Sequence, residues 1–156
     1  MKDEVPPYLQ HRGIASVLVK VPAVLYNVGL GLLLRRHLLL LTTSGRKSGR
    51  PRTAPLAYQR IDDTLYLLSE AGTHADWYRN LAKHPTVWVQ VGNRRFPATA
   101  ERVTDPQTIA RVLRIFNRAS PRGAQRYYGI PPRATDEELL ALAPRRLVVA
   151  LREMTA

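Results

Sequence analysis

The sequence contains no cysteine and has only two tryptophans, two phenylalanines and two methionines among its 156 residues. Without cysteine there is no disulfide framework, and the chain offers no thiolate as a nucleophile or a metal ligand. This absence fits a reducing cytosol, so we expect a cytoplasmic protein. Its chemistry must use other side chains or a bound group.

Acidic residues are also scarce. Twelve Asp and Glu face twenty-four Lys and Arg, which gives a net charge of +12. Such a surface attracts anions over a distance, and three classes of partner remain open: nucleic acid, anionic lipid and a phosphorylated small molecule.

Metal ligands and catalytic triads leave no recognisable pattern. The four histidines lie at positions 11, 37, 74 and 84, without the spacing of a metal site. No Ser-His-Asp set or pair of carboxylates stands out either. We therefore expect no metal, and if the protein is an enzyme, a bound cofactor supplies the difficult chemistry.

The one long apolar run, residues 13–34, is interrupted by Lys20, Pro22 and Asn27. Its apolar residues recur every three or four positions, which predicts an amphipathic helix. This helix could cover the core of the domain or lie on a membrane surface, for example the inner face of the cell membrane, helped by two arginines that follow it. A lysine near the middle argues against a membrane span. We expect a single domain, with an N-terminal helical segment at 1–36 and the main fold at 37–156.

Short strand-like segments dominate the rest of the chain. Turn residues separate them, and Pro55 argues against a regular central strand where it lies. The predicted strands are 37–43, 52–61, 64–69, 85–91, 94–103 and 145–153, with helices at 75–84, after Thr104 or Asp105, and at 135–142; residues 119–134 are expected to be irregular or briefly helical. This order is α+β, and a small antiparallel barrel would leave few open edges.

A basic hairpin, "SGRKSGRPR", joins the first two predicted strands. Its glycines at 45 and 49 allow successive amides to point into one concavity, and its cations and serines add donors for an anion. A phosphate-binding Walker loop is excluded because Arg46 separates Gly45 from Lys47. The hairpin could still be only a solvated turn, a nucleic-acid contact or a grip on the anionic end of a cofactor.

Two segments together resemble the deazaflavin-dependent nitroreductase and quinone reductase family. They are "LLLLTTSGRKSGRPRTAPLAY" at 38–58 and "DWYRNLAKHPTVWVQVG" at 76–92, and the similarity continues to residue 103. The resemblance implies a split β-barrel with an N-terminal helix and, as hydride donor, a reduced 8-hydroxy-5-deazaflavin (coenzyme F-420). It implies hydride transfer to a quinone, a nitroaromatic or an enone-like acceptor, and split-barrel relatives are often homodimers.

The resemblance also assigns site residues. Lys47 and Arg52 would contact the anionic tail of the cofactor, while Trp77 could equally serve the core through its spacing from Leu81. Tyr127 and Tyr128 would shape the acceptor side as catalytic hydrogen-bond donors. The full set expected to bind the cofactor is Arg46, Lys47, Ser48, Arg52, Pro55, Leu56, Tyr58, Ser69, Gly72, Trp77, Tyr78 and Asn80.

One position departs from the family pattern. Where relatives commonly have a lysine after the third strand, this chain has Glu70, which would repel a nearby phosphate. Either Glu70 turns outward, or the anion lies elsewhere, or the ligand differs. The alternatives are therefore a reductase that uses flavin mononucleotide, a flavin or lipid carrier without turnover and, less favoured, a nucleic-acid-binding protein.

Overall fold

The computed structural model describes residues 38–92 and 94–155. The predicted N-terminal helix over 13–36 lies outside the described residues. Within the described part, no helix is both long enough and apolar enough to cross a membrane.

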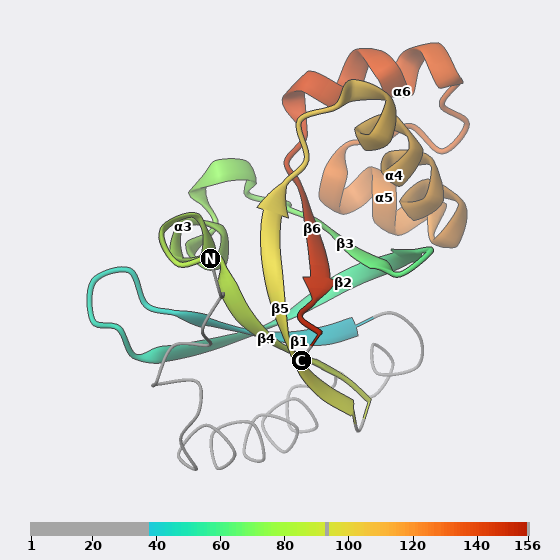
Figure 1. Cartoon of the computed structure of the whole chain (residues 1–156). Helices are drawn as coiled ribbons and strands as arrows, with labels where there is room; N and C mark the ends of the chain where they lie inside the picture. Colours follow the sequence, from blue (N-terminus) through green and yellow to red (C-terminus); the bar gives the residue numbers. More distant parts are fainter. Residues whose placement is uncertain (1–37, 93, 156) are drawn as a thin grey trace.

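Six strands close into a barrel in which every neighbouring pair is antiparallel, in the order β1-β2-β3-β6-β5-β4 (Figure 1). The strands are β1 (Leu38–Ser44), β2 (Pro51–Ile61), β3 (Thr64–Leu68), β4 (Thr86–Val91), β5 (Arg94–Arg102) and β6 (Val148–Glu153). Closure leaves the strands few open edges, which is the reason for expecting a barrel from so many short segments. The predicted α+β split barrel is confirmed.

The helices form two groups. The short helix α3 (Asp76–Lys83), preceded by the single turn η2 (Gly72–His74), lies beside the β1–β2 hairpin (Figure 1). The helices α4 (Pro106–Ala119), α5 (Pro121–Tyr128) and α6 (Asp136–Leu142) pack together at the other side, followed by the turn η3 (Ala143–Arg145). Capping side chains explain where these three helices begin. Asp105 caps α4, Ser120 caps α5, and Thr135 with Glu138 forms the predicted capping box of α6.

Two apolar cores follow from this division. The interior of the barrel is filled by inward-facing residues such as Leu41, Val87 and Leu151. A second core, around Leu113 and Ile130, lies between the helical layer and the barrel. The helix α3 contributes Leu81 to the first core, so the cores fix α3 and the helical layer to the barrel independently.

The strand β2 changes partners along its length, and this explains Pro55. Residues 51–57 pair with β1, whereas the pairing with β3 begins only at Tyr58. Pro55 therefore lies where β2 has a neighbour on one side, and a residue without a backbone N–H is tolerated there. The strand is continuous, but at Pro55 it is not a strand with two partners, as the sequence indicated.

Candidate functional site

The loop between β1 and β2 is a tight turn that needs its glycines. The Gly45 N–H donates to the Arg50 carbonyl at 2.8 Å, and the Gly49 N–H donates to the Gly45 carbonyl at 2.7 Å. Gly49 has a φ of 69°, a left-handed conformation that side chains disfavour. A Cβ on Gly45 would lie 2.9 Å from Ser48 Oγ and 3.1 Å from the Arg50 carbonyl oxygen, so the Ser48 side chain and the backbone of the turn would both have to shift to accept one.

Asn80 of α3 joins this hairpin to the helix. Its Oδ1 accepts hydrogen bonds from the Arg46 backbone N–H at 3.1 Å and from Arg46 Nη1 at 3.0 Å. Its Nδ2 donates to Thr43 Oγ1 on β1 at 3.2 Å, and the side chain is buried. At the end of α3, Lys83 Nζ donates to the Arg46 carbonyl at 2.9 Å. Two residues of α3 thus hold both the strand end and the loop.

The Arg46 guanidinium is engaged in contacts within the protein. In addition to the bond with Asn80, Arg46 Nη2 forms an ion pair with Asp76 Oδ1 at 3.0 Å. Lys47 and Arg52 differ, because neither side chain has a hydrogen bond or ion pair with any residue that the structure describes. The exposed side chain of Arg50 has no such partner either, so these three cations of the hairpin stay available for an external anion.

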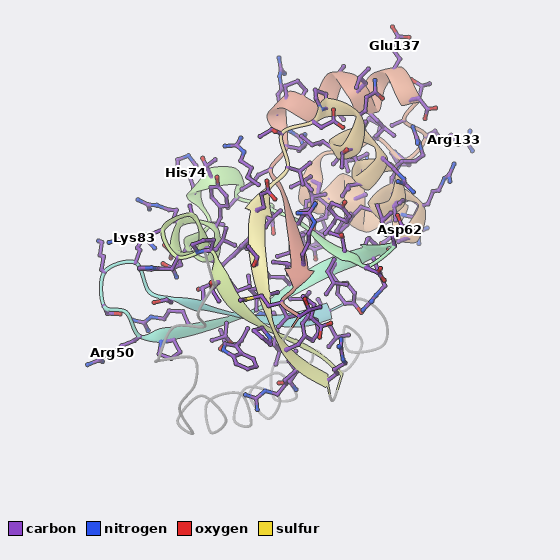
Figure 2. All side chains as sticks on the ribbon, viewed as in Figure 1. Arg50, Asp62, His74, Lys83, Arg133 and Glu137 are labelled. Atoms are coloured by element: carbon purple, nitrogen blue, oxygen red, sulfur yellow. The ribbon has the colours of Figure 1, made fainter. Side chains whose placement is uncertain are left out.

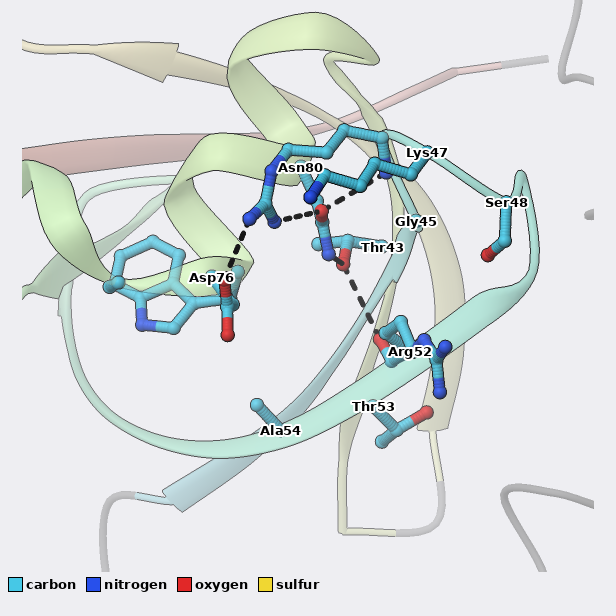
Figure 3. A pocket seen from close by; sticks show the side chains of 12 residues that line it. Thr43, Gly45, Lys47, Ser48, Arg52, Thr53, Ala54, Asp76 and Asn80 are labelled. Carbon is cyan, nitrogen blue, oxygen red and sulfur yellow. Dashed lines mark hydrogen bonds and ion pairs between the residues drawn. The ribbon is translucent and has the colours of Figure 1, made fainter.

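A cleft of about 590 Å³ opens between the hairpin and α3, and Figure 3 shows its lining side chains. The volume is in the range of small-molecule sites. Its walls combine the free cations with small and apolar residues from β2 and α3. The lining residues are Thr43, Gly45, Arg46, Lys47, Ser48, Arg52, Thr53, Ala54, Ala75, Asp76, Trp77 and Asn80.

Half of the residues predicted to bind a cofactor meet in this cleft: Arg46, Lys47, Ser48, Arg52, Trp77 and Asn80. Trp77 lines the cleft and also packs against the barrel core, so its packing role is observed and its role in cofactor binding stays a prediction. Asn80 lines the cleft mainly as the link described above.

The other predicted binding residues lie outside the lining. Leu56 and Tyr58 pack against the barrel core farther along β2, Tyr78 packs there from α3, and Pro55 is exposed. Ser69 is buried, and its hydroxyl donates to the Gly72 carbonyl at 2.9 Å, which closes the turn after β3.

Tyr127 and Tyr128, the predicted catalytic pair, lie on α5 and do not line the cleft. Tyr127 is exposed, whereas Tyr128 packs edge-on against Phe116 of α4, with ring centroids 5.8 Å apart. Burial is the main cause that raises the pKa of Tyr128 to about 12, and the nearby Glu70 and Tyr127 contribute to the same rise. The phenol of Tyr128 therefore stays protonated throughout the neutral range.

Glu70 resolves one of the alternatives that the sequence left open. The residue is exposed and is absent from the lining of the cleft. Its carboxylate acts on Tyr128 instead, through the pKa of the phenol. The repulsion expected between Glu70 and a phosphate at the hairpin is therefore not built into the cleft.

Sequence reasoning did not select Thr43, Gly45, Thr53, Ala54, Ala75 or Asp76 as binding residues, although all six line the cleft. A signal was present for some of them. Alternate residues of a strand share a face, so naming Arg52 implied that Ala54 lies on the same side. Asp76 gave no signal as a binding residue, because a carboxylate at the start of a helix is favoured by the helix dipole alone.

Comparisons with known proteins identify the family of this chain. Residues 21–131, more than half of the chain, match the model of the family described as F420H(2)-dependent quinone reductase. An F420H(2)-dependent quinone reductase of Mycobacterium tuberculosis is 34% identical over 113 residues, which cover 69% of this chain and 73% of the relative.

Solved structures show the same fold at lower identity. An F420-H2-dependent reductase aligns with a TM-score of 0.54 at 24% identity, over 74% of this chain and 94% of that one. The heme storage protein of Vibrio cholerae aligns with a TM-score of 0.55 at 17% identity, over 78% and 84% of the two chains. At these identities the structures support the split barrel, and the family assignment rests on the sequence matches. On that evidence the resemblance found in the two sequence segments is confirmed, and this chain belongs to the F420H(2)-dependent quinone reductase family.

Proposed function

We propose that this protein is a deazaflavin-dependent quinone reductase that binds its reduced cofactor in the cleft between the β1–β2 hairpin and α3. The observation that carries the proposal is the pair of free cations, Lys47 and Arg52, at the edge of a cleft with an apolar side. Family membership supplies the cofactor and the acceptor class, and the cleft supplies a place that suits them.

The donors present fit an anionic tail. A guanidinium presents several N–H groups to phosphate or carboxylate oxygens, and a lysine adds a mobile point charge. The Ser48 hydroxyl lines the same part of the cleft. Ala54, Ala75 and Trp77 offer the apolar surface against which a flat ring can be held. Each class of group that the cofactor needs is therefore represented.

When bound, the reduced deazaflavin supplies a hydride, and the quinone gains that hydride and a proton to become a quinol. The protein's part is orientation and electrostatics. Lys47 and Arg52 would anchor the tail, while Trp77 restricts the space beside the ring. Asn80 keeps the hairpin at a fixed position relative to α3, so the anchor does not drift. This chain needs no covalent nucleophile for such a reaction.

The catalytic role of Tyr127 and Tyr128 stays a prediction. Tyr128 is suited to donate a hydrogen bond at neutral pH, because its raised pKa keeps the phenol protonated. Both tyrosines would have to act on an acceptor that extends beyond the described cleft toward α5.

A fluorescence titration with oxidised deazaflavin coenzyme, run beside flavin mononucleotide, tests the proposal. We expect Lys47→Ala and Arg52→Ala each to weaken deazaflavin binding by about 10- to 100-fold, which is the range of one charge-assisted contact. A matched control is the double variant Arg122→Ala/Arg133→Ala, since both arginines are exposed in the helical layer, and Figure 2 shows Arg133 far from the hairpin. The control removes the same charge and should leave binding unchanged.

Unchanged affinity in the Lys47→Ala/Arg52→Ala double variant would refute the assignment of the cleft. Tight binding of flavin mononucleotide alone would keep the site and replace the cofactor. Binding of neither would favour a lipid carrier or a nucleic-acid partner.

Two further parts of the hypothesis stay predictions. One solved neighbour, at 24% identity, is described as a domain-swapped dimer, which supports testing this protein for a homodimer. Contact of residues 13–36 with a membrane surface would suit a lipophilic quinone. Sedimentation of the protein with and without anionic vesicles addresses both.

A further inference from the structure

The cleft proposed to bind an anion contains one carboxylate. Among the described residues that line it, Asp76 is the acidic side chain, beside the three cations Arg46, Lys47 and Arg52. A carboxylate there lowers the positive charge of the site and opposes the approach of a phosphate. This placement calls for a reason other than binding strength.

The Asp76 side chain makes no capping hydrogen bond at the start of α3, although its charge in the first turn suits the helix dipole. The N-cap of α3 is Ala75, and no side chain accepts a hydrogen bond from the first N–H groups of the helix. The Asp76 side chain is 80% exposed, and its carboxylate pairs with Arg46 Nη2 at 3.0 Å, where the Arg46 side chain is 23% exposed (Figure 3). An ion pair at such a surface contributes little to stability.

Arg46 does not need Asp76 to stay in place. Its backbone N–H and Nη1 are held by Asn80, and its carbonyl accepts from Lys83. The Asp76 contact is an additional bond to Nη2, a guanidinium nitrogen that Asn80 does not engage. An incoming anion could take over that nitrogen without dismantling the hairpin.

We propose that Asp76 is an affinity-setting residue: its carboxylate occupies Arg46 Nη2 in the absence of ligand and competes with the anionic tail of the cofactor for it. This inference rests on the proposed function. Its consequence is faster release of the spent cofactor. One reduced deazaflavin is consumed for each quinone reduced, so a separate reaction that re-reduces the deazaflavin must receive it from this site.

The variant Asp76→Asn isolates the charge, because the amide oxygen can still accept from Arg46. We expect the oxidised coenzyme to bind about 3- to 10-fold more tightly at low ionic strength, the effect of removing one like charge a few ångströms away. The gain should shrink as salt is added. Stopped-flow displacement should show a slower dissociation rate, because the negative charge that competes with the tail is gone.

Asp136→Asn is the matched control. Asp136 also occupies the first turn of a helix, α6, and pairs with Arg114 at 2.6 Å, with side-chain exposures of 81% and 31%. The two variants change the net charge equally, and Asp136 lies outside the cleft. A gain seen in both variants would reflect the overall charge and would overturn the inference.

A second ligand separates competition from structure. The same deazaflavin chromophore without its phosphate and acidic tail should bind equally to wild type and Asp76→Asn. Weaker coenzyme binding in Asp76→Asn, together with a lower melting temperature, would show that Asp76 only supports the hairpin and would overturn the proposal. Unchanged coenzyme binding would overturn it as well. If the wild-type protein binds flavin mononucleotide but no deazaflavin, the proposed cofactor is wrong, and the competition by Asp76 is then measured with flavin mononucleotide. If it binds neither, both the proposed function and the proposed role of Asp76 are wrong.

Discussion

Asn80→Ala gives the most direct test of how α3 positions the hairpin. The substitution deletes three hydrogen bonds, two from Arg46 to Oδ1 and one from Nδ2 to Thr43. Each such bond contributes about 0.5–1.5 kcal/mol net, and the Asn80 side chain is only 4% exposed, so water cannot fully replace it. We expect a loss of about 2–4 kcal/mol in the free energy of unfolding.

The assay is urea and thermal unfolding followed by circular dichroism, combined with the deazaflavin titration. A loss of that size should lower the melting temperature by roughly 5–15 °C for a domain of this size. Coenzyme binding should weaken too, because Lys47 and Arg52 depend on the geometry of the hairpin.

Asn117→Ala is the control for this variant. Asn117 is 7% exposed, and its Nδ2 donates to the Pro131 and Pro132 carbonyls at 3.1 and 3.3 Å, on the helical side of the barrel. It should lose stability without losing affinity. An Asn80→Ala protein that loses less than about 1 kcal/mol, or that binds the coenzyme as wild type does, would refute the view that Asn80 positions the hairpin.

Two more predictions concern Tyr128 and Gly49. The pKa of Tyr128 is raised from its usual value near 10 to about 12, so the protonated phenol contributes stability below pH 10 that is lost as the pH rises toward 12. Tyr128→Phe should therefore lose less stability than wild type over that range. In an absorbance titration, the variant should lack the tyrosine that ionises at the highest pH. An equal loss in both proteins would contradict this. Gly49→Ala, at a φ of 69°, should cost about 1–2 kcal/mol of stability and weaken coenzyme binding, whereas Gly92→Ala, at a φ of 57° in the β4–β5 turn, should affect stability alone. Calorimetry measures the stability of the two variants, and the deazaflavin titration measures their binding. If both variants bind the coenzyme equally well, the conformation of Gly49 does not matter for the site and the prediction is wrong.

The strands and helices were predictable because their signals are local. The capping residues of α4 and α6 stand beside the segments that they start, and the alternating apolar residues mark the strands. The hairpin could also be predicted as one unit, since Arg46, Lys47 and Arg52 are close neighbours in sequence.

The pairings that divide roles among these residues were not predictable. The ion pair between Arg46 and Asp76 joins residues thirty positions apart, and it distinguishes Arg46, whose guanidinium already has partners, from the two other cations that line the cleft. The effect of Glu70 on Tyr128 likewise depends on how the helical layer rests on the barrel. The fold determines which charged residues meet. The sequence alone therefore could not distinguish a cation that is paired within the protein from one that is left to bind an anion.

The change of partners along β2 has a consequence for solubility. Between Pro51 and Ala57 the strand has β1 on one side and, among the described strands, no partner on the other. A bare strand edge invites pairing with another chain, and proline and positive charge are two devices that prevent it. Pro55 and Arg52 supply both on this edge. Arg52, which we assign to the cofactor, thus also opposes aggregation. Replacing Arg52 should cause less aggregation when Pro55 is kept than when both residues are replaced.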